Sequence, residues 1–170
     1  DFENMDKVRD IESHNIWNLS GKLHFPKKLR WEMIRLKSRD NARTPMQWSA
    51  SENGGFTSGE PWLSVNSNFK EINVENQQHD KKSVLAYYKK LIAIRNESHV
   101  LKSGSFTELY RSGGVYAFLR EHEGERLITA INLTNKIKNA PVSGEALISN
   151  YGKSYIYGKL YPYEAAIIRG

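Results

Sequence analysis

The hydrophobic pattern of this 170-residue chain changes its period once, and this change constrains the fold more than any other feature. Up to about residue 97, apolar residues recur at the spacing of α-helices. From about residue 105 they occur in short runs separated by turn residues. A helical part followed by several short strands is typical of an α+β protein with an antiparallel sandwich. The sequence therefore predicts helices and a long loop in residues 1–97, and an antiparallel β-sandwich domain in residues 98–170.

Three helices and one helical turn are predicted in the first part, over residues 10–19, 27–37, 81–96 and 73–78. Gly21 is expected to end the first helix, Pro26 to open the second, and Asp80 to cap the longest one. The apolar residues at helical spacing are Ile11, Ile16 and Leu19; Leu29, Met33 and Leu36; and Val84, Tyr87, Tyr88, Leu91 and Ile94. The last group predicts a buried face on the longest helix.

Five strands are predicted in the second part, and two glycine-containing turns separate the first three. The strands cover residues 106–110, 115–120, 126–132, 146–148 and 165–168. The turns are Gly113-Gly114 and residues 122–124. Short strands with regular turns favour the antiparallel arrangement.

The loop between the helices is rich in arginine, amide and tryptophan side chains, beginning with the run SRDNARTPMQW at residues 38–48. Pro45 opposes a continuous helix there, and the glycines that follow keep the next stretch irregular. Guanidinium and amide groups bind hydroxyls, while aromatic rings cover the apolar side of a sugar, so the loop suits a sugar site. The alternative is a structural loop in which Arg39, Asp40 and Arg43 pair with one another.

The run SRDNARTPMQW, followed by GFTSGEPWLSVN and NFKEINV, resembles the C-terminal third of bacterial α-glucosidases. These enzymes form the oligo-1,6-glucosidase group of glycoside hydrolase family thirteen, in the α-amylase superfamily. Dextran glucosidase, trehalose-6-phosphate hydrolase and sucrose isomerase are related. The resemblance includes residues 10–13, 83–95 and 160–165, and it departs at Ser49, where the family usually carries an acidic or amide residue.

This resemblance implies that residues 1–97 are the last loop insertion and last helix of a (β/α)8 barrel, and that residues 98–170 are an accessory β-domain. In the family, an aspartate nucleophile, a glutamate acid/base and a third aspartate lie on earlier barrel strands. No catalytic residue is therefore expected in this chain. We expect a fragment that is inactive alone, whose partner is the missing barrel of a retaining α-glucosidase for short, mainly α-1,6-linked, glucosides.

The resemblance also implies roles for individual loop residues. In the family, the first arginine of the motif reaches the pocket for the terminal glucose, pairs with an aspartate early in the barrel and bonds a sugar hydroxyl. That role is carried over to Arg39, while Asp40, Arg43 and Trp48 are expected to be loop scaffold. No cofactor is expected, and no metal, because the five histidines lack the spacing of metal ligands.

Charge and composition limit the remaining classes of function. The net charge of +6 is divided evenly, with +3 in residues 1–97 and +3 in residues 98–170, which argues against a nucleic-acid partner. No apolar run approaches the ~20 residues of a membrane helix, and the absence of cysteine favours a cytoplasmic location.

Two alternatives to the α-glucosidase reading remain. One is a free-standing carbohydrate-binding β-module whose exposed Tyr110, Tyr155 and Tyr157 hold glycans, and the other is a basic nucleic-acid-binding domain.

Overall fold

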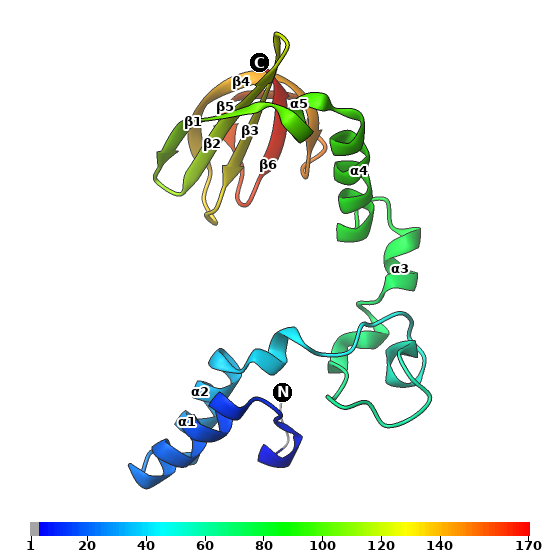
Figure 1. Cartoon of the computed structure of the whole chain (residues 1–170), viewed down its shortest axis with the longest axis vertical. Helices are drawn as coiled ribbons and strands as arrows, with labels where there is room; N and C mark the ends of the chain where they lie inside the picture. Colours follow the sequence, from blue (N-terminus) through cyan, green and yellow to red (C-terminus); the bar gives the residue numbers. More distant parts are fainter. Residues whose placement is uncertain (1–3) are drawn as a thin grey trace. The chain divides into compact units, whose positions relative to one another are not determined.

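The computed structural model describes residues 4–170, and these divide into two compact units between Leu85 and Ala86. The division falls inside helix α4 (Val84–Glu97). Helices precede the strands along the chain, as Figure 1 shows, and all strand pairs are antiparallel. The predicted α+β class is confirmed. The boundary between residues 97 and 98, which concerns the parent barrel, stays a prediction.

The first unit consists of short helices joined by irregular segments. Its elements are η1 (Met5–Lys7), α1 (Ile11–Lys22), α2 (Lys27–Lys37), η2 (Arg39–Ala42), η3 (Glu52–Gly55), η4 (Ser67–Lys70) and α3 (Val74–His79). Helices α1 and α2 pack through Trp17 and Trp31, whose ring centroids are 4.6 Å apart. The Arg30 guanidinium lies 3.8 Å from the centroid of the Trp17 ring. These aromatic and cation–π contacts fix the helix pair that leads into the long loop.

Gly21 does not end α1, which is a correction to the sequence prediction. The helix continues past it and stops where His24 adopts a left-handed φ of 57°. Gly21 instead permits the close approach of α2, because a Cβ there would lie 3.0 Å from Nη2 of Arg30. That atom is the far end of a flexible side chain and can shift, so the contact favours glycine here without requiring it.

Several apolar side chains on α1 and α2 are exposed within this chain. Leu36 is 81% exposed, Ile11 73% and Leu19 60%, whereas Ile34 is fully buried. The helical spacing was correctly identified, but the apolar stripes have no covering partner among residues 4–170.

The long loop is irregular, as expected, and short 3-10 turns and backbone hydrogen bonds hold it in place. The Trp48 N–H donates to the Gly54 carbonyl at 2.7 Å, and the Gln47 side-chain amide donates to Oδ1 of Asn68 at 3.0 Å. Gly55 has a φ of 69°, and a Cβ there would lie 2.6 Å from Oγ of Ser49. Both its backbone conformation and its contacts therefore require glycine.

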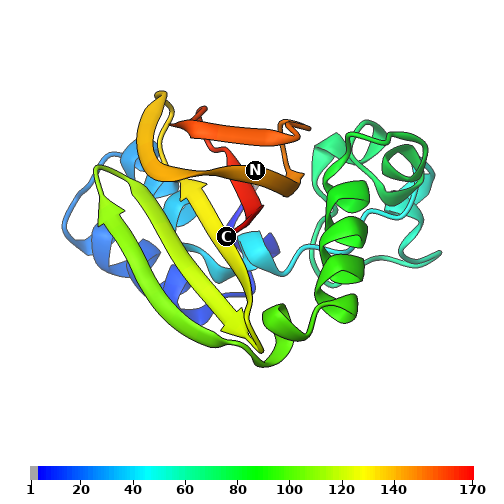
Figure 2. The same cartoon turned by 90° about the horizontal axis from the view of Figure 1, so that it is seen from above.

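The second unit is a six-stranded sheet with α4 and α5 (His99–Ser103). The strands are β1 (Ser105–Ser112), β2 (Val115–His122), β3 (Glu125–Asn132), β4 (Lys138–Ser149), β5 (Tyr155–Leu160) and β6 (Ala165–Arg169). Their order in the sheet is β1-β2-β3-β6-β4-β5. Figure 2 shows the long strand β4 bending, so that its first half and β5 lie over the other strands. The two layers of the expected sandwich thus come from one folded sheet.

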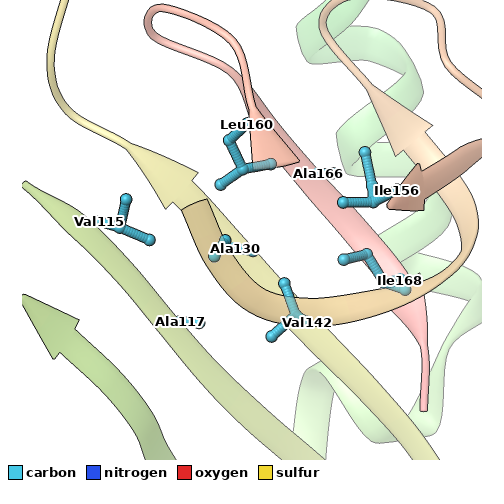
Figure 3. Close-up of a cluster of buried hydrophobic side chains, with 9 residues drawn as sticks. Val115, Ala117, Ala130, Val142, Ile156, Leu160, Ala166 and Ile168 are labelled. Carbon is cyan, nitrogen blue, oxygen red and sulfur yellow. The ribbon is translucent and has the colours of Figure 1, made fainter. Parts of the chain in front are cut away.

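The core of this unit lies between those two layers. Nine buried side chains form it, and Figure 3 labels all of them except Ala140. They are Val115 and Ala117 from β2, Ala130 from β3, Ala140 and Val142 from β4, Ile156 and Leu160 from β5, and Ala166 and Ile168 from β6. Three of the five core side chains on β2, β3 and β6 are alanines, which lets the two layers approach closely.

The sequence prediction missed β5 and the first half of β4. Pro141 stands where β4 shifts its register between Asn139 and Ser143, and Gly158 gives β5 a residue with a φ of 69°. Proline and glycine normally mark the ends of strands. Because of them, β5 and the first half of β4 do not show the alternation of apolar and polar residues that predicts a strand. Here Pro141 and Gly158 lie in the irregular β4–β5 ladder at one edge of the sheet.

Helix α4 begins later than predicted. Asp80 does not cap it; the Asp80 Oδ1 accepts the Lys82 N–H at 2.8 Å. The Gln77 side-chain oxygen accepts the Leu85 N–H at 3.0 Å, in the first turn of the helix. An amide from the preceding helix therefore supplies the acceptor that Asp80 was expected to give.

One face of α4 packs on the sheet of the second unit. Tyr87, Leu91 and Ile94 lie against a second buried cluster. That cluster comprises Val100, Leu127, Ile148 and Ile167. These three residues are partly buried and not fully buried as predicted, while Val84 is 68% exposed and Tyr88 is 59% exposed.

Candidate functional site

The candidate site lies where α2 ends and the loop begins. Ser38 terminates α2 and caps the 3-10 turn η2, because its Oγ accepts the Asp40 N–H at 3.3 Å. The tight turn that follows separates the two charged neighbours. The Arg39 side chain is 56% exposed, whereas Asp40 is 1% exposed.

Arg39 is held by Asp10. Its Nη2 lies 2.7 Å from Oδ1 of Asp10, and its Nε–H donates to the same oxygen at 2.8 Å. Asp10 is the N-cap of α1, where its Oδ2 accepts both the N–H and the hydroxyl of Ser13, at 3.2 and 2.8 Å. With both oxygens of Asp10 occupied, the carboxylate cannot turn, and it anchors one edge of the guanidinium.

The electrostatics of the pair favour its ionised form. Burial alone would raise the pKa of Asp10, but hydrogen bonds from Ser13 and Arg39 outweigh burial and lower that pKa to about 2. The Asp10 carboxylate in turn raises the pKa of Arg39. The guanidinium therefore stays charged, with its remaining N–H groups open to solvent.

Asp40 serves the backbone and not a neighbouring arginine. Its Oδ2 accepts the N–H groups of Arg9 and Asp10 at 2.6 and 3.0 Å, which ties the loop to the start of α1. Its Oδ1 is buried without a hydrogen-bond partner among the described residues. The alternative in which Arg39, Asp40 and Arg43 pair with one another is therefore wrong.

Arg43 and Trp48 lie further along the loop. The Arg43 N–H donates to the Asp40 carbonyl at 3.0 Å, but its exposed side chain forms no ion pair within residues 4–170. Trp48 is 51% exposed, and its carbonyl accepts the Glu75 N–H at 3.0 Å. Both make backbone contacts that suit a scaffold, but the scaffold role of Asp40, Arg43 and Trp48 stays a prediction.

The partner of Arg39 was not identified from the sequence. Asp10 could have been found from its place before Ile11, since aspartate is a favoured N-cap residue and Ile11 begins the helical spacing. Nothing in the sequence pairs it with an arginine 29 positions later. Among residues 4–170, no three histidine, cysteine or acidic side chains gather as metal ligands, and no helix is long and apolar enough to span a membrane.

The tyrosines proposed for a carbohydrate-binding module separate into two groups. Tyr155 and Tyr157 lie together on β5, with ring centroids 4.4 Å apart. Tyr110, on β1, is partly buried and packs against the core of the sheet. The structure therefore brings two of the three together at an exposed edge.

Comparison with protein families gives a match to the α-amylase catalytic domain over residues 10–104. The chain is 35% identical to an oligo-1,6-glucosidase of Halalkalibacterium halodurans, covering 99% of this chain and 32% of that protein. It is 37% identical to a glucan 1,6-α-glucosidase of Streptococcus pneumoniae, with coverage of 96% and 32%. A trehalose-6-phosphate hydrolase of Escherichia coli is 38% identical over 81% of this chain and 25% of its own length.

Comparison with solved structures gives the same kind of match. The trehalulose synthase MutB from Pseudomonas mesoacidophila superposes with a TM-score of 0.84 at 32% identity, over 99% of this chain and 33% of that one. The isomaltulose synthase of Klebsiella sp. LX3 gives 0.85 at 30% identity, over 99% and 32%. The chain corresponds to the C-terminal part of these proteins and spans about a third of their length.

Proposed function

Because this chain belongs to the α-amylase family, we propose that it is the C-terminal, non-catalytic portion of a retaining α-glucosidase. The catalytic carboxylates belong to a barrel that would be its partner. In this proposal the loop supplies one sugar-binding residue, Arg39, and the β-domain stabilises the barrel. The protein would act in the cytoplasm on short oligosaccharides.

The observation that carries the proposal is the arrangement of Arg39. One edge of its guanidinium is fixed by Asp10, while more than half of the side chain remains exposed. A guanidinium held in this way offers Nη1 and the outer Nη2 hydrogen in a fixed direction to a hydroxyl. Because this pairing is formed within the chain, the further aspartate expected from the barrel would be an additional partner of Arg39.

Several relatives indicate the substrate class. Those named oligo-1,6-glucosidase and glucan 1,6-α-glucosidase favour α-1,6-linked glucose. A trehalose-6-phosphate hydrolase, an isomaltulose synthase and a trehalulose synthase share the same C-terminal region, so other parts of the protein would select the linkage.

Steady-state kinetics of the full-length protein test the role of Arg39. Arg39→Ala should lower kcat/KM for isomaltose roughly ten- to a hundredfold, because it removes a charged hydrogen bond and leaves the Asp10 carboxylate without that partner. Arg39→Lys should recover only part of the loss, since an ammonium cannot reproduce the planar fork.

Arg43→Ala is the matched control, because Arg43 lies four residues away and its exposed side chain has no ion-pair partner in the described chain. On folded protein it should change kcat/KM less than Arg39→Ala does. A larger loss from Arg43→Ala would reverse the roles of the two arginines.

A further inference from the structure

The second unit carries a groove of about 520 Å³ at β5, the edge strand of the sheet. Aromatic rings and lysine side chains line it, and it has no part in the site around Arg39. Along β5, Tyr155, Tyr157 and Lys159 are exposed, whereas Ile156 and Leu160 are buried in the core. The period of a strand therefore places the two tyrosines and the lysine on one outward face.

The two rings form a platform. Tyr155 and Tyr157 have centroids 4.4 Å apart, and Tyr157 is 78% exposed although it is a large aromatic side chain. Tyr161, which follows the strand, is 42% exposed at the same groove. Three half-exposed or exposed rings at one groove are more than isolated surface aromatics.

A partly buried ion pair fixes one end of the groove. Lys153 donates to Oε2 of Glu164 at 2.7 Å, and its ammonium lies 3.6 Å from the centroid of the Tyr161 ring. Glu164 is fully buried and also accepts the Tyr161 N–H at 2.7 Å and the Ser149 hydroxyl at 3.1 Å. These contacts hold the ring and the lysine without any ligand, so the groove is preorganised.

Polar groups of both signs border the platform. In the β4–β5 ladder, Ser143 lies opposite Tyr157, and Glu145 lies opposite Tyr155. Glu145 is exposed, and its Oε2 lies 3.5 Å from Nε of Arg169. Lys159 makes no ion pair among residues 4–170. Hydroxyl, carboxylate and ammonium groups around aromatic faces favour a neutral polyol over an anion or a cation.

We propose that this β5 groove is a second, non-catalytic saccharide site that holds an α-linked glucan chain through residues other than those around Arg39. The apolar faces of glucose units would lie on Tyr157 and Tyr155, while Lys159, Ser143 and Glu145 bond their hydroxyls. The choice of α-glucan among neutral polyols rests on the proposed function. Such a site raises the local concentration of chain ends for the parent enzyme.

Native affinity electrophoresis of this chain tests the site, with dextran or soluble starch in the gel and laminarin as the β-linked comparison. The wild-type chain should be retarded by an α-glucan and not by laminarin. Tyr157→Ala should weaken the apparent affinity about tenfold, because it removes the most exposed ring of the platform. Tyr157→Trp should keep or increase the retardation, which a merely misfolded variant would not do.

Two controls separate this inference from the proposed function. Tyr88→Ala removes another exposed tyrosine, which lies outside the groove, and should leave retardation unchanged. Arg39→Ala should also leave it unchanged, because the two sites are distinct. The β5 site would be overturned if neither α-glucan retards the chain, or if laminarin alone retards it. It would also be overturned if Arg39→Ala abolishes the retardation. None of these results changes the kinetic test of Arg39 in the full-length protein.

Discussion

Arg39 and Asp10 form an ion pair of 2.7 Å in which the arginine side chain is 56% exposed and the aspartate side chain 1% exposed. The asymmetry matters because a buried, doubly bonded carboxylate fixes the direction of a guanidinium that still faces solvent. Asp10 also caps α1, so the start of that helix and the orientation of Arg39 depend on the same carboxyl group.

Acid should weaken the first unit through Asp10. The folded-state pKa of about 2 lies below the ordinary 3.8, so the carboxylate stabilises the fold above pH 3.8. That contribution is lost as the pH falls from 3.8 to about 2. Urea unfolding followed by tryptophan fluorescence measures it, because all four tryptophans lie in residues 1–85. Asp10→Asn should lower stability at pH 6 and flatten the loss between pH 4 and 2; an unchanged acid slope would contradict this account.

Asp40→Ala should destabilise the first unit by about 2 kcal/mol or more, because it leaves the N–H groups of Arg9 and Asp10 without their acceptor. The same fluorescence-detected urea titration gives the value. Arg43→Ala, at an exposed position in the same loop, should change stability by less than about 0.5 kcal/mol. Equal effects of the two variants would mean that Asp40 is not the anchor of the loop.

Leu91→Ala should destabilise the second unit by about 1–2 kcal/mol. Full burial would give ~2–5 kcal/mol, but Leu91 is only partly buried against the cluster under α4. Ile92→Ala is the neighbouring control, since Ile92 is 55% exposed and should cost less than about 0.5 kcal/mol. Far-UV circular dichroism during urea unfolding measures both. If Ile92→Ala were the more damaging, the packed face of α4 would be misassigned.

Much of the fold follows from local patterns in the sequence. Helical spacing located α1, α2 and α4, and alternation with glycine turns located β1, β2 and β3, because these signals depend on neighbouring residues. Local sequence patterns failed to predict the structure where contacts between distant residues determine it. Gly21 lies inside a helix, next to the Arg30 side chain, and Gly158 lies inside a strand at the sheet edge.

The candidate site was predictable only in part. The motif around Arg39 is a continuous run of residues, so it could be found in the sequence. Its partner Asp10 is 29 positions away, and Asp40 bonds backbone groups near residue 10, so neither contact leaves a local signature. The Lys153–Glu164 pair under Tyr161 likewise depends on how β6 lies against β4.

Hydrolysis of p-nitrophenyl α-glucoside is the most direct test of the central claim, that this chain is the non-catalytic part of an α-glucosidase. The purified chain should release p-nitrophenol no faster than a buffer blank, whereas the full-length protein should release it readily. Turnover by the chain alone that persists through repurification, or an inactive full-length protein that is folded, would contradict the account.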